Sequence, residues 1–263
     1  MKRTLSLLLV LLLSVGLLAG CGGDTKTAGD KTDTNANKDT VYKIATDTTF
    51  APFEFQDKDG KYVGIDIDLL EAIAQDQGFK YELNPLGFNA AVAALESNQA
   101  DGVIAGMSIT AERQKKYDFS APYYDSGVVM AVKADNDNIK SYQDLAGKKV
   151  AVKTGTEGAT FAESIKDANK FELVYFDESP MMYEDVKTGN TAACFEDYPV
   201  MGYGITQGNG LKMVTDMEKG SSYGFAVFKG KNQDLLKMFD AGLKNIKDNG
   251  KYQEIMDKYI SAK

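Results

Sequence analysis

The sequence predicts an α/β fold in which helices flank mostly parallel sheets. From residue 41 onward, short apolar runs typical of strands alternate with stretches whose apolar residues recur at helical spacing. Glycines follow several of these stretches, where a helix commonly ends. Alternating β and α units place consecutive strands in one direction and join them by right-handed crossovers. The pattern therefore predicts mostly parallel sheets.

Individual elements follow from the same patterns. The expected strands are Val41–Ala45, Lys80–Leu83, Gly102–Ala105, Val128–Val132, Lys149–Val152, Glu172–Phe176, Ala192–Phe195 and Phe225–Phe228. Helical spacing of apolar residues occurs within 69–73, 92–95, 181–186, 235–246 and 252–260. The glycines at expected helix ends are Gly78, Gly147, Gly189 and Gly250. Ser141 and Asp144 stand three residues apart and predict a helix start with a reciprocal cap.

The composition argues against several classes of catalyst. The chain of 263 residues contains no histidine, which removes Ser-His and Cys-His nucleophiles, histidine general bases and histidine metal sites. With 30 Lys and Arg against 38 Asp and Glu, the net charge is −8. An acidic surface argues against nucleic acid and anionic lipid as partners. The composition favours a binding protein over an enzyme, with no cofactor and no metal.

The N-terminal residues have the pattern of an export signal. Two basic residues precede an apolar stretch that ends in Leu18-Ala-Gly-Cys21. The stretch is too short for a membrane span, which needs about 20 residues. Its ending resembles a lipobox, which implies that residues 1–20 are removed as a lipoprotein signal peptide and that Cys21 is acylated. We therefore expect a lipid-anchored protein at the cell membrane, facing the extracellular or periplasmic side.

A tether is expected after the lipidated cysteine. Residues 22–40 contain only Gly, Asp, Thr, Lys, Ala and Asn, with no apolar side chain larger than alanine. Such a segment cannot offset the entropy of ordering it. Residues 21–40 should therefore form a flexible tether, with a root-mean-square reach of about 25 Å. The remaining chain is long enough for one large or two modest domains.

Four segments occur in a characteristic order in this remaining chain. They are 45–55 (ATDTTFAPFEF), 64–69 (GIDIDL), 105–113 (AGMSITAER) together with 118–124 (DFSAPYY), and 152–156 (VKTGT). In their order and spacing they resemble the polar-amino-acid solute-binding proteins of ABC importers, and glutamine-binding proteins in particular. The resemblance spans residues 41–260.

This resemblance implies a two-lobed, periplasmic-binding-protein-like fold of type II, with the ligand in the cleft between the lobes. Lobe one would consist of 41–123 and 226–263, and lobe two of 124–225, with hinge crossovers near 123–127 and 221–225. Open α/β sheets generally bind ligands at such a cleft. The resemblance also implies a monomeric, non-enzymatic receptor. It would capture an amino acid and deliver it to a membrane permease driven by an ATPase.

A free amino acid presents a carboxylate and an ammonium group, and the sequence offers a partner for each. Arg113 follows a cap at Thr110 by one turn, so it offers a guanidinium fork beside the N–H groups of a helix start. Asp197 falls where the family places its ammonium acceptor. Each has a plain structural alternative: Arg113 as a surface residue beside Glu112, and Asp197 as an N-cap ahead of Pro199.

The other implied ligand contacts concern the side chain of the ligand. Phe50 and Phe88 match the aromatic walls of the family, which sandwich the aliphatic stem, although either could belong to the core. In glutamine-binding relatives, the residue matching Asp47 accepts from the amide N–H and the one matching Lys153 faces the amide oxygen. The whole implied ligand set is Asp47, Phe50, Phe88, Gly106, Ser108, Arg113, Lys153, Thr156, Glu157, Glu196 and Asp197.

Two residues depart from the glutamine-binding pattern. Glu157 replaces the small residue usual after Thr156, and Glu196 stands where glutamine binders often carry histidine. The four acidic residues of the set against its two basic ones give a charge of −2 if all are ionised. A zwitterion adds nothing to that sum, whereas a positive side chain would balance it. Glutamine is the expected ligand, and arginine or another basic amino acid is the alternative.

An enzyme on the same fold is a further alternative. The fold also hosts cyclohexadienyl dehydratases, and a desolvated glutamate such as Glu196 or Glu157 could serve there as a general acid. Because Asp197 and Arg113 suit an amino-acid backbone, the sequence favours the binding protein.

Overall fold

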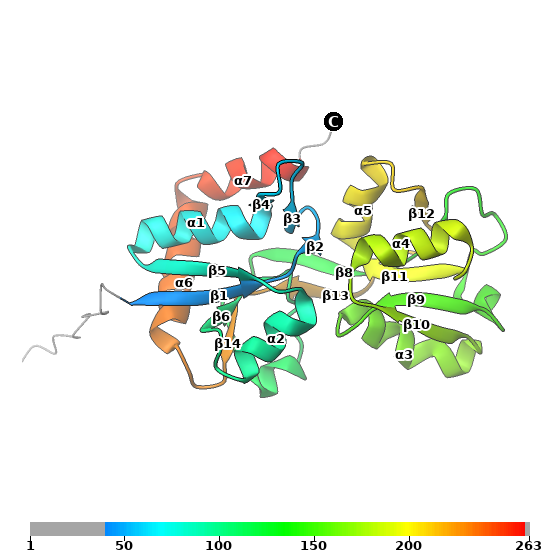
Figure 1. Ribbon diagram of the computed structural model, residues 1–263, viewed down its shortest axis with the longest axis horizontal. Coiled ribbons are helices and arrows are strands. Elements are labelled where there is room, and N and C mark those ends of the chain that lie inside the picture. The colour runs from blue at the N-terminus through cyan, green and yellow to red at the C-terminus, as the bar shows by residue number, and fades with distance from the viewer. Residues whose placement is uncertain (1–39, 261–263) are drawn as a thin grey trace, which may run out of the picture. The chain divides into compact units, whose positions relative to one another are not determined.

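The computed structural model describes residues 40–260, all of which belong to the unit Ala36–Lys263. The expected signal peptide, the acylated Cys21 and nearly all of the expected tether lie outside the described residues. Two large sheets, each with helices on both faces, organise the described chain (Figure 1). We term the first sheet with its helices lobe one, and the second sheet with its helices lobe two.

Lobe one is built on a five-stranded sheet. In spatial order its strands are β5 (Lys80–Pro85), β1 (Val41–Thr46), β6 (Gly102–Val103), β14 (Ala226–Phe228) and β7 (Tyr117–Phe119). A small sheet of β2 (Thr49–Phe50), β3 (Glu54–Gln56) and β4 (Tyr62–Val63) follows β1. The helices are α1 (Ile65–Gln77), α2 (Phe88–Glu96), α6 (Gln233–Asp248) and α7 (Lys251–Ile260), with a 3-10 turn η1 (Arg113–Lys115).

Different helices cover the two faces of this sheet. Ile44 and Ala45 are consecutive in β1, so their side chains point to opposite faces. Ile44 belongs to the core formed with α1, α6 and α7, and Ala45 to the core formed with α2. Because the side chains of this strand alternate between the two faces, one apolar layer lies on each side of the sheet.

Lobe two is built on a six-stranded sheet. Its strands are β10 (Glu172–Phe176), β9 (Lys149–Lys153), β11 (Ala193–Asp197), β8 (Tyr124–Lys133) and β12 (Leu211–Met213), while β13 (Glu218–Tyr223) pairs with β8. Its helices are α3 (Glu157–Asn169), α4 (Ser179–Thr188) and α5 (Tyr198–Thr206), with a 3-10 turn η2 (Tyr142–Leu145). Met130 packs toward α3, and its neighbours Val129 and Ala131 pack toward α4 and α5.

Each of the two large sheets is mixed, whereas the sequence predicted mostly parallel sheets. The strands β5, β1 and β6 run parallel, as do β10, β9 and β11. In contrast, β14 is antiparallel to β6 and β7, and β8 is antiparallel to β11, β12 and β13. Both β8 and β14 enter their sheets from the other lobe without a helical crossover, so the right-handed βαβ rule does not fix their direction.

The chain passes between the lobes along two adjacent strands. β8 begins at Tyr124 and β13 ends at Tyr223, and these two residues lie opposite each other in an antiparallel pair. The pairing continues at Ser126 and Ser221. The segments expected as crossovers therefore form a paired ribbon, in which each segment is hydrogen-bonded to the other.

The sequence located most of the elements that surround the site. Every expected strand and every expected helical stretch is present, with ends that differ by a few residues. Gly78 and Gly189 end their helices in the left-handed conformation, and the capping box of Ser141 and Asp144 is formed, although it starts a short 3-10 turn. In the part of the chain that the structure describes, the elements not expected are five strands of two or three residues, the six-residue strand β13 and the helices α3 and α5. Strands of two or three residues are too short to show an alternation.

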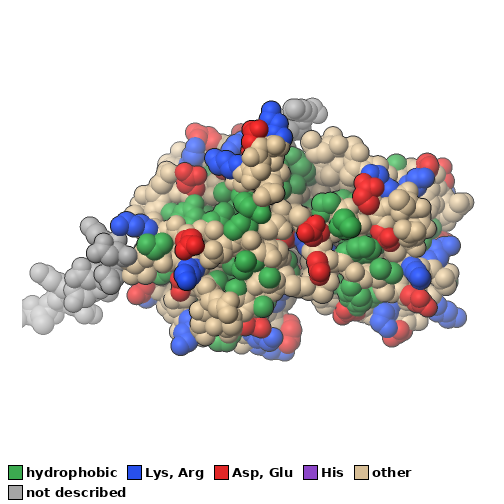
Figure 2. Space-filling view, in the orientation of Figure 1, with side chains coloured by type: hydrophobic (Ala, Val, Ile, Leu, Met, Phe, Trp, Pro, Cys, Tyr) green, Lys and Arg blue, Asp and Glu red, His purple; other side chains and the backbone are tan. Residues whose placement is uncertain are grey.

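The surface carries both signs of charge. Acidic and basic side chains are interspersed over the face that Figure 2 shows, with hydrophobic side chains between them. Across residues 40–260, we find no helix whose length and apolar content would let it cross a bilayer.

Candidate functional site

A small cavity lies where the strand ends of lobe one meet those of lobe two. The residues that line it come from the ends of β1 and β6, from β2, from the starts of α2 and α3, and from the end of β11. They are Asp47, Phe50, Phe88, Ala105, Gly106, Ser108, Arg113, Thr156, Glu157 and Asp197. This set brings together the residues expected from the sequence, except Lys153 and Glu196, and adds Ala105.

Arg113 connects the two lobes. Its backbone N–H donates to Thr110 Oγ1 at 3.2 Å, which is the hydrogen bond expected from Thr110, but only the 3-10 turn η1 follows and its N-cap position is Glu112. The guanidinium donates to the carbonyl oxygen of Ser108 at 2.9 Å and to that of Gly155, in lobe two, at 3.0 Å. It also lies 3.8 Å from Glu157 Oε1. Burial lowers the pKa of Arg113, and the charges of Glu157 and Asp197 oppose this effect.

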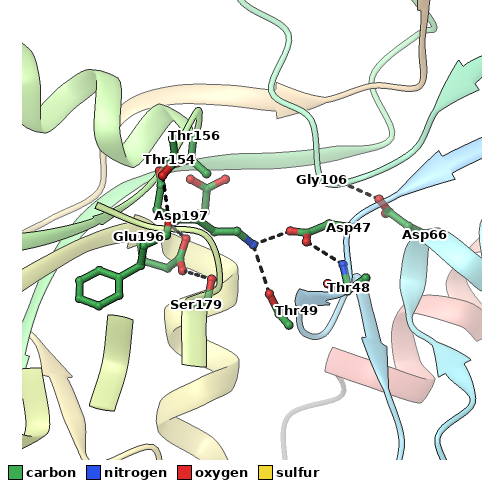
Figure 3. A network of polar contacts seen from close by, with 12 residues as sticks. Asp47, Thr48, Thr49, Asp66, Gly106, Thr154, Thr156, Ser179, Glu196 and Asp197 are labelled. Carbon is green, nitrogen blue, oxygen red and sulfur yellow. Dashed lines mark hydrogen bonds and ion pairs between the residues drawn. The ribbon is translucent and has the colours of Figure 1, made fainter. Parts of the chain in front are cut away.

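Asp47 and Lys153 form a buried ion pair between the lobes. Lys153 Nζ lies 2.5 Å from Asp47 Oδ2, and the two side chains are 1% and 2% exposed. The ammonium also lies 3.5 Å from Thr49 Oγ1 (Figure 3). The acceptor and the donor expected to face a ligand amide are thus paired with each other, which compensates two charges withdrawn from water.

The aromatic side chains of the cavity each face a cation. The ring centre of Phe88 lies 5.4 Å from the guanidinium carbon of Arg113. The ring centre of Phe50 lies 5.3 Å from Lys153 Nζ. Both distances are within the range of a cation–π contact. The rings fix the positions of the charged groups and give the cavity two apolar walls.

Asp197 and Glu196 point in different directions. Glu196 accepts a hydrogen bond from Ser179 Oγ at 2.8 Å (Figure 3). It accepts a second one from Tyr183 OH at 2.8 Å, and both donors belong to α4. Asp197 lines the cavity, and Tyr223 OH donates to its Oδ2 at 2.5 Å. Consecutive residues of a strand face opposite sides of the sheet. This alternation explains why Glu196 lies outside the lining.

Burial governs the titration of both carboxyl groups. The pKa of Asp197 is raised to about 7, mainly by burial and also by the charge of Glu196, against the hydrogen bond from Tyr223 and the charge of Arg113. Burial likewise raises the pKa of Glu196, against the opposing charge of Lys153. The charge of −2 expected with all six groups ionised is therefore an overestimate of the negative charge near neutral pH.

The start of α3 supplies the remaining lobe-two contacts. Thr156 Oγ1 accepts from the backbone N–H of Ala159 at 3.3 Å and donates to the carbonyl oxygen of Lys153 at 2.8 Å. It is therefore an N-cap that ties the helix to the strand before it. Glu157, the first residue of α3, points its carboxylate toward the lobe-one guanidinium of Arg113.

Sequence reasoning missed two residues that hold this site in place. Tyr223, on the returning crossover strand, is fully buried and donates to Asp197. Asp66 accepts from the backbone N–H of Gly106 at 2.7 Å (Figure 3). Tyr223 lies in an expected crossover, and Asp66 lies in the GIDIDL motif. The sequence analysis assigned neither residue a contact with the site.

Among residues 40–260, no group of three or more His, Cys, Asp or Glu side chains could hold a metal ion. The charged groups of the cavity are instead arranged as a cation and anions that could contact a small zwitterion.

Two lobes around a small, charged cavity define a solute-binding protein of type II fold. The family model of bacterial extracellular solute-binding proteins, family 3, matches residues 42–262, and the chain belongs to this family.

Relatives with known functions bind different amino acids. The L-cystine-binding protein TcyJ of Escherichia coli (strain K12) is 30% identical over 253 residues, which cover 95% of this chain and 93% of the relative. The ABC transporter glutamine-binding protein GlnH of Bacillus subtilis (strain 168) is 32% identical over 274 residues, which cover 99% of this chain and 98% of the relative.

Solved structures of similar proteins have the same fold. An ancestral arginine-binding protein bound to arginine has a TM-score of 0.78 and 38% identity, and the match covers 84% of this chain and 98% of that one. An ancestral amino-acid-binding protein described as a precursor of cyclohexadienyl dehydratase has a TM-score of 0.77 and 35% identity, covering 84% and 96%.

Proposed function

We propose that this protein binds one polar amino acid, in the first place glutamine, and delivers it to the permease of an ABC importer. The observation that carries the proposal is that Arg113 of lobe one and Asp197 of lobe two line the same cavity. A guanidinium pairs with a carboxylate, and a carboxylate pairs with an ammonium group. The two residues would thus recognise the part that all amino acids share. The family membership supports this reading.

The ion pair beside the cavity has no net charge, which supports glutamine as the ligand. Asp47 and Lys153 neutralise each other as a pair. A terminal amide could enter this pair, since it donates through its NH₂ group to a carboxylate and accepts through its oxygen from an ammonium group. The raised pKa values of Asp197 and Glu196 reduce the negative charge that would otherwise attract a cationic side chain.

Arginine or another basic amino acid is the second candidate. The acidic residue Glu157 in the cavity wall supports it, because a carboxylate there could pair with a cationic side chain of the ligand. The similarity to an ancestral protein bound to arginine supports it as well. An arginine side chain would require Lys153 to move away from Asp47, because two cations repel each other in a dry site.

We further propose the domain organisation that the sequence implies. Residues 1–20 would be a cleaved signal peptide, and 21–40 a tether anchored by a lipid on Cys21. Lobe one would comprise 41–123 and 226–263, and lobe two 124–225. The paired strands β8 and β13 support this division, since they carry the chain between the two sheets. The protein would act as a monomer on the outer side of the cell membrane.

We propose that the protein is not an enzyme. The similarity to a precursor of cyclohexadienyl dehydratase is the observation that favours the alternative. Against it, Glu196 is held by Ser179 and Tyr183 and does not line the cavity. Incubation with prephenate or arogenate tests this point: we expect no product, and turnover at an enzymatic rate would make the protein a dehydratase.

Native mass spectrometry after mild purification tests the ligand directly. We expect a bound species with the mass of glutamine. A competition titration of L-glutamine against L-arginine by calorimetry then ranks the two candidates. Tighter binding of arginine would replace glutamine as the ligand, and binding of neither would exclude both candidates.

A further inference from the structure

Two carboxyl groups lie fully buried beneath the cavity without a cation of their own. Glu54 of β3 and Asp66 of α1 both have 0% exposure. Backbone hydrogen bonds at 2.9 Å join Ile65 N–H to the oxygen of Pro52 and Asp66 N–H to that of Phe53. These bonds bring β3 against the first turn of α1, so that the two carboxyl groups come within hydrogen-bonding reach of each other.

The polar atoms of this pair are incompletely satisfied. Both carboxyl oxygens of Glu54, and Oδ1 of Asp66, have no hydrogen-bond donor among the described residues. Each such atom costs about 1–3 kcal/mol when it is left unpaired. A single proton held between the groups would give Asp66 Oδ1 a donor and remove one of two facing negative charges.

The other oxygen of Asp66 holds two parts of the site. Oδ2 accepts from Gly106 N–H at 2.7 Å and from Tyr123 OH at 2.8 Å. Gly106 lines the cavity, and Tyr123 directly precedes the crossover strand β8. One carboxylate therefore links the loop that lines the cavity to the strand that leads into lobe two.

The charged groups around the pair do not supply a counterion. Glu54 faces Asp66 of α1, Asp47 after β1 and Lys153 of β9, and Tyr123 faces both carboxyl groups. Lys153 is already paired with Asp47. Burial raises the pKa of Glu54 well above its ordinary value, and the charge of Asp66 raises it further. Burial raises the pKa of Asp66 only to about 6, because the bonds from Gly106 and Tyr123 favour its charge.

We propose that Glu54 and Asp66 share one proton and together position the cavity loop. Glu54 is the donor to Asp66 Oδ1, and Asp66 Oδ2 holds Gly106 and Tyr123. Asp66 is thus a positioning residue, since it acts on a ligand through the backbone of Gly106. The effect on binding rests on the proposed function, whereas the shared proton does not.

Loss of the shared proton has a defined consequence. Two buried carboxylates would then face each other, which is strongly unfavourable in a low-dielectric interior. The repulsion would displace Asp66 from Gly106 and Tyr123. Ligand affinity should therefore fall on the alkaline side, once Glu54 ionises.

The test compares Glu54→Gln, Glu54→Leu and the wild type in titrations with L-glutamine and with L-arginine across neutral and alkaline pH. Glutamine at position 54 can donate to Asp66 as the proton does, but it cannot ionise. We expect it to keep the affinity of the wild type at neutral pH and to abolish the alkaline fall. Glu54→Leu cannot donate and should weaken binding by about tenfold or more. Asp68→Asn is the control, because Asp68 pairs with Lys258 away from the cavity.

A measurement without ligand follows the proton itself. Carbon-13 NMR of the side-chain carboxyl groups should show that one of the pair Glu54 and Asp66 is protonated at neutral pH, and this signal should be lost in Glu54→Gln. The proposal is overturned if both groups are ionised at neutral pH or if the alkaline fall persists in Glu54→Gln. If neither amino acid binds to the wild type, the proposed function fails and the NMR titration still decides the shared proton.

Discussion

Arg113 is held from both lobes by carbonyl oxygens, which use two of its five N–H donors. A bound carboxylate would add charge-assisted hydrogen bonds worth about 1.5–3 kcal/mol each. We expect Arg113→Ala to weaken binding of both glutamine and arginine by about a hundredfold or more, because it removes these bonds and leaves the carboxylate unpaired. Titration calorimetry measures the loss.

Arg113→Lys is the matched variant, since it keeps the charge and loses the planar fork. It should bind more weakly than the wild type and more tightly than Arg113→Ala. A loss of less than tenfold in Arg113→Ala would show that this residue does not contact the carboxylate.

Substitution of Lys153 distinguishes between the two candidate ligands. Lys153→Met removes the donor expected for a terminal amide, so glutamine should bind more weakly. It also removes a repulsion, so a guanidinium could occupy the place beside Asp47 and arginine should bind more tightly. Competition calorimetry on the wild type and the variant detects the reversal.

The variant also leaves Asp47 buried without its cation, which costs about 3–5 kcal/mol of stability. The double variant Asp47→Asn with Lys153→Met provides the control, since it removes both charges together. Tighter glutamine binding by Lys153→Met would contradict the contact between Lys153 and the amide.

At the scale of the elements, the loop after β6 is constrained by Gly106. Its φ of +53° is a conformation that other residues rarely adopt, and a Cβ atom there would lie 2.4 Å from Cε1 of Phe50. We expect Gly106→Ala to push the aromatic wall away and to weaken ligand binding by about tenfold or more, at a cost of about 1–3 kcal/mol in stability. Calorimetry and urea unfolding measure the two effects.

Gly78 gives a matched control for this loop. Its φ is +72°, but a Cβ atom there has nothing within 4 Å. Gly78→Ala should therefore cost stability through backbone strain alone and leave affinity unchanged. Equal affinity of the two variants would mean that the contact with Phe50 does not shape the cavity.

For the whole molecule, the buried carboxyl groups predict how stability depends on pH. The pKa values of Asp197 and Asp66 are raised to about 7 and about 6, and those of Glu54 and Glu196 are also raised. A raised carboxyl pKa means that the folded state binds more protons than the unfolded state. Its stabilising effect is complete below the unfolded pKa of about 4 and is lost as pH rises through the folded value.

The free energy of unfolding should therefore increase as the pH falls from about 7 toward about 5. One pKa unit corresponds to about 1.4 kcal/mol, so Asp197 alone contributes about 2 kcal/mol between pH 7 and pH 5. Urea unfolding at a series of pH values measures the slope, and Asp197→Asn should reduce it. Stability that rises with pH over this interval would contradict the prediction.

Closure of the two lobes around a ligand also involves the whole molecule. Arg113 belongs to lobe one and Asp197 to lobe two, so one amino acid can contact both only when the lobes approach each other. Small-angle X-ray scattering should give a smaller radius of gyration with saturating ligand than without it. The variant Arg113→Ala should show no such change at the same ligand concentration, and an unchanged wild-type profile would argue against a hinge in the paired strands.

Local patterns in the sequence determined most of the secondary structure. Strands such as Glu172–Phe176 and helix ends such as Gly189 depend on neighbours within a few residues, so periodicity and turn chemistry suffice to locate them. The resemblance carried by the ordered motifs also selected the residues that line the cavity, including Arg113 and Asp197. It did so because their types and spacing match those of a known family.

Only the tertiary structure decided how the charged residues are partnered. Asp47 and Lys153 are 106 residues apart and form an ion pair, Glu196 turns toward α4, and Glu54 meets Asp66 without a cation. Each outcome depends on which side chains are brought within a few ångströms by packing of distant segments, and on how far burial suppresses their charge. No pattern within a short stretch of sequence contains that information, because the energy of a charge is set by everything that surrounds it in space.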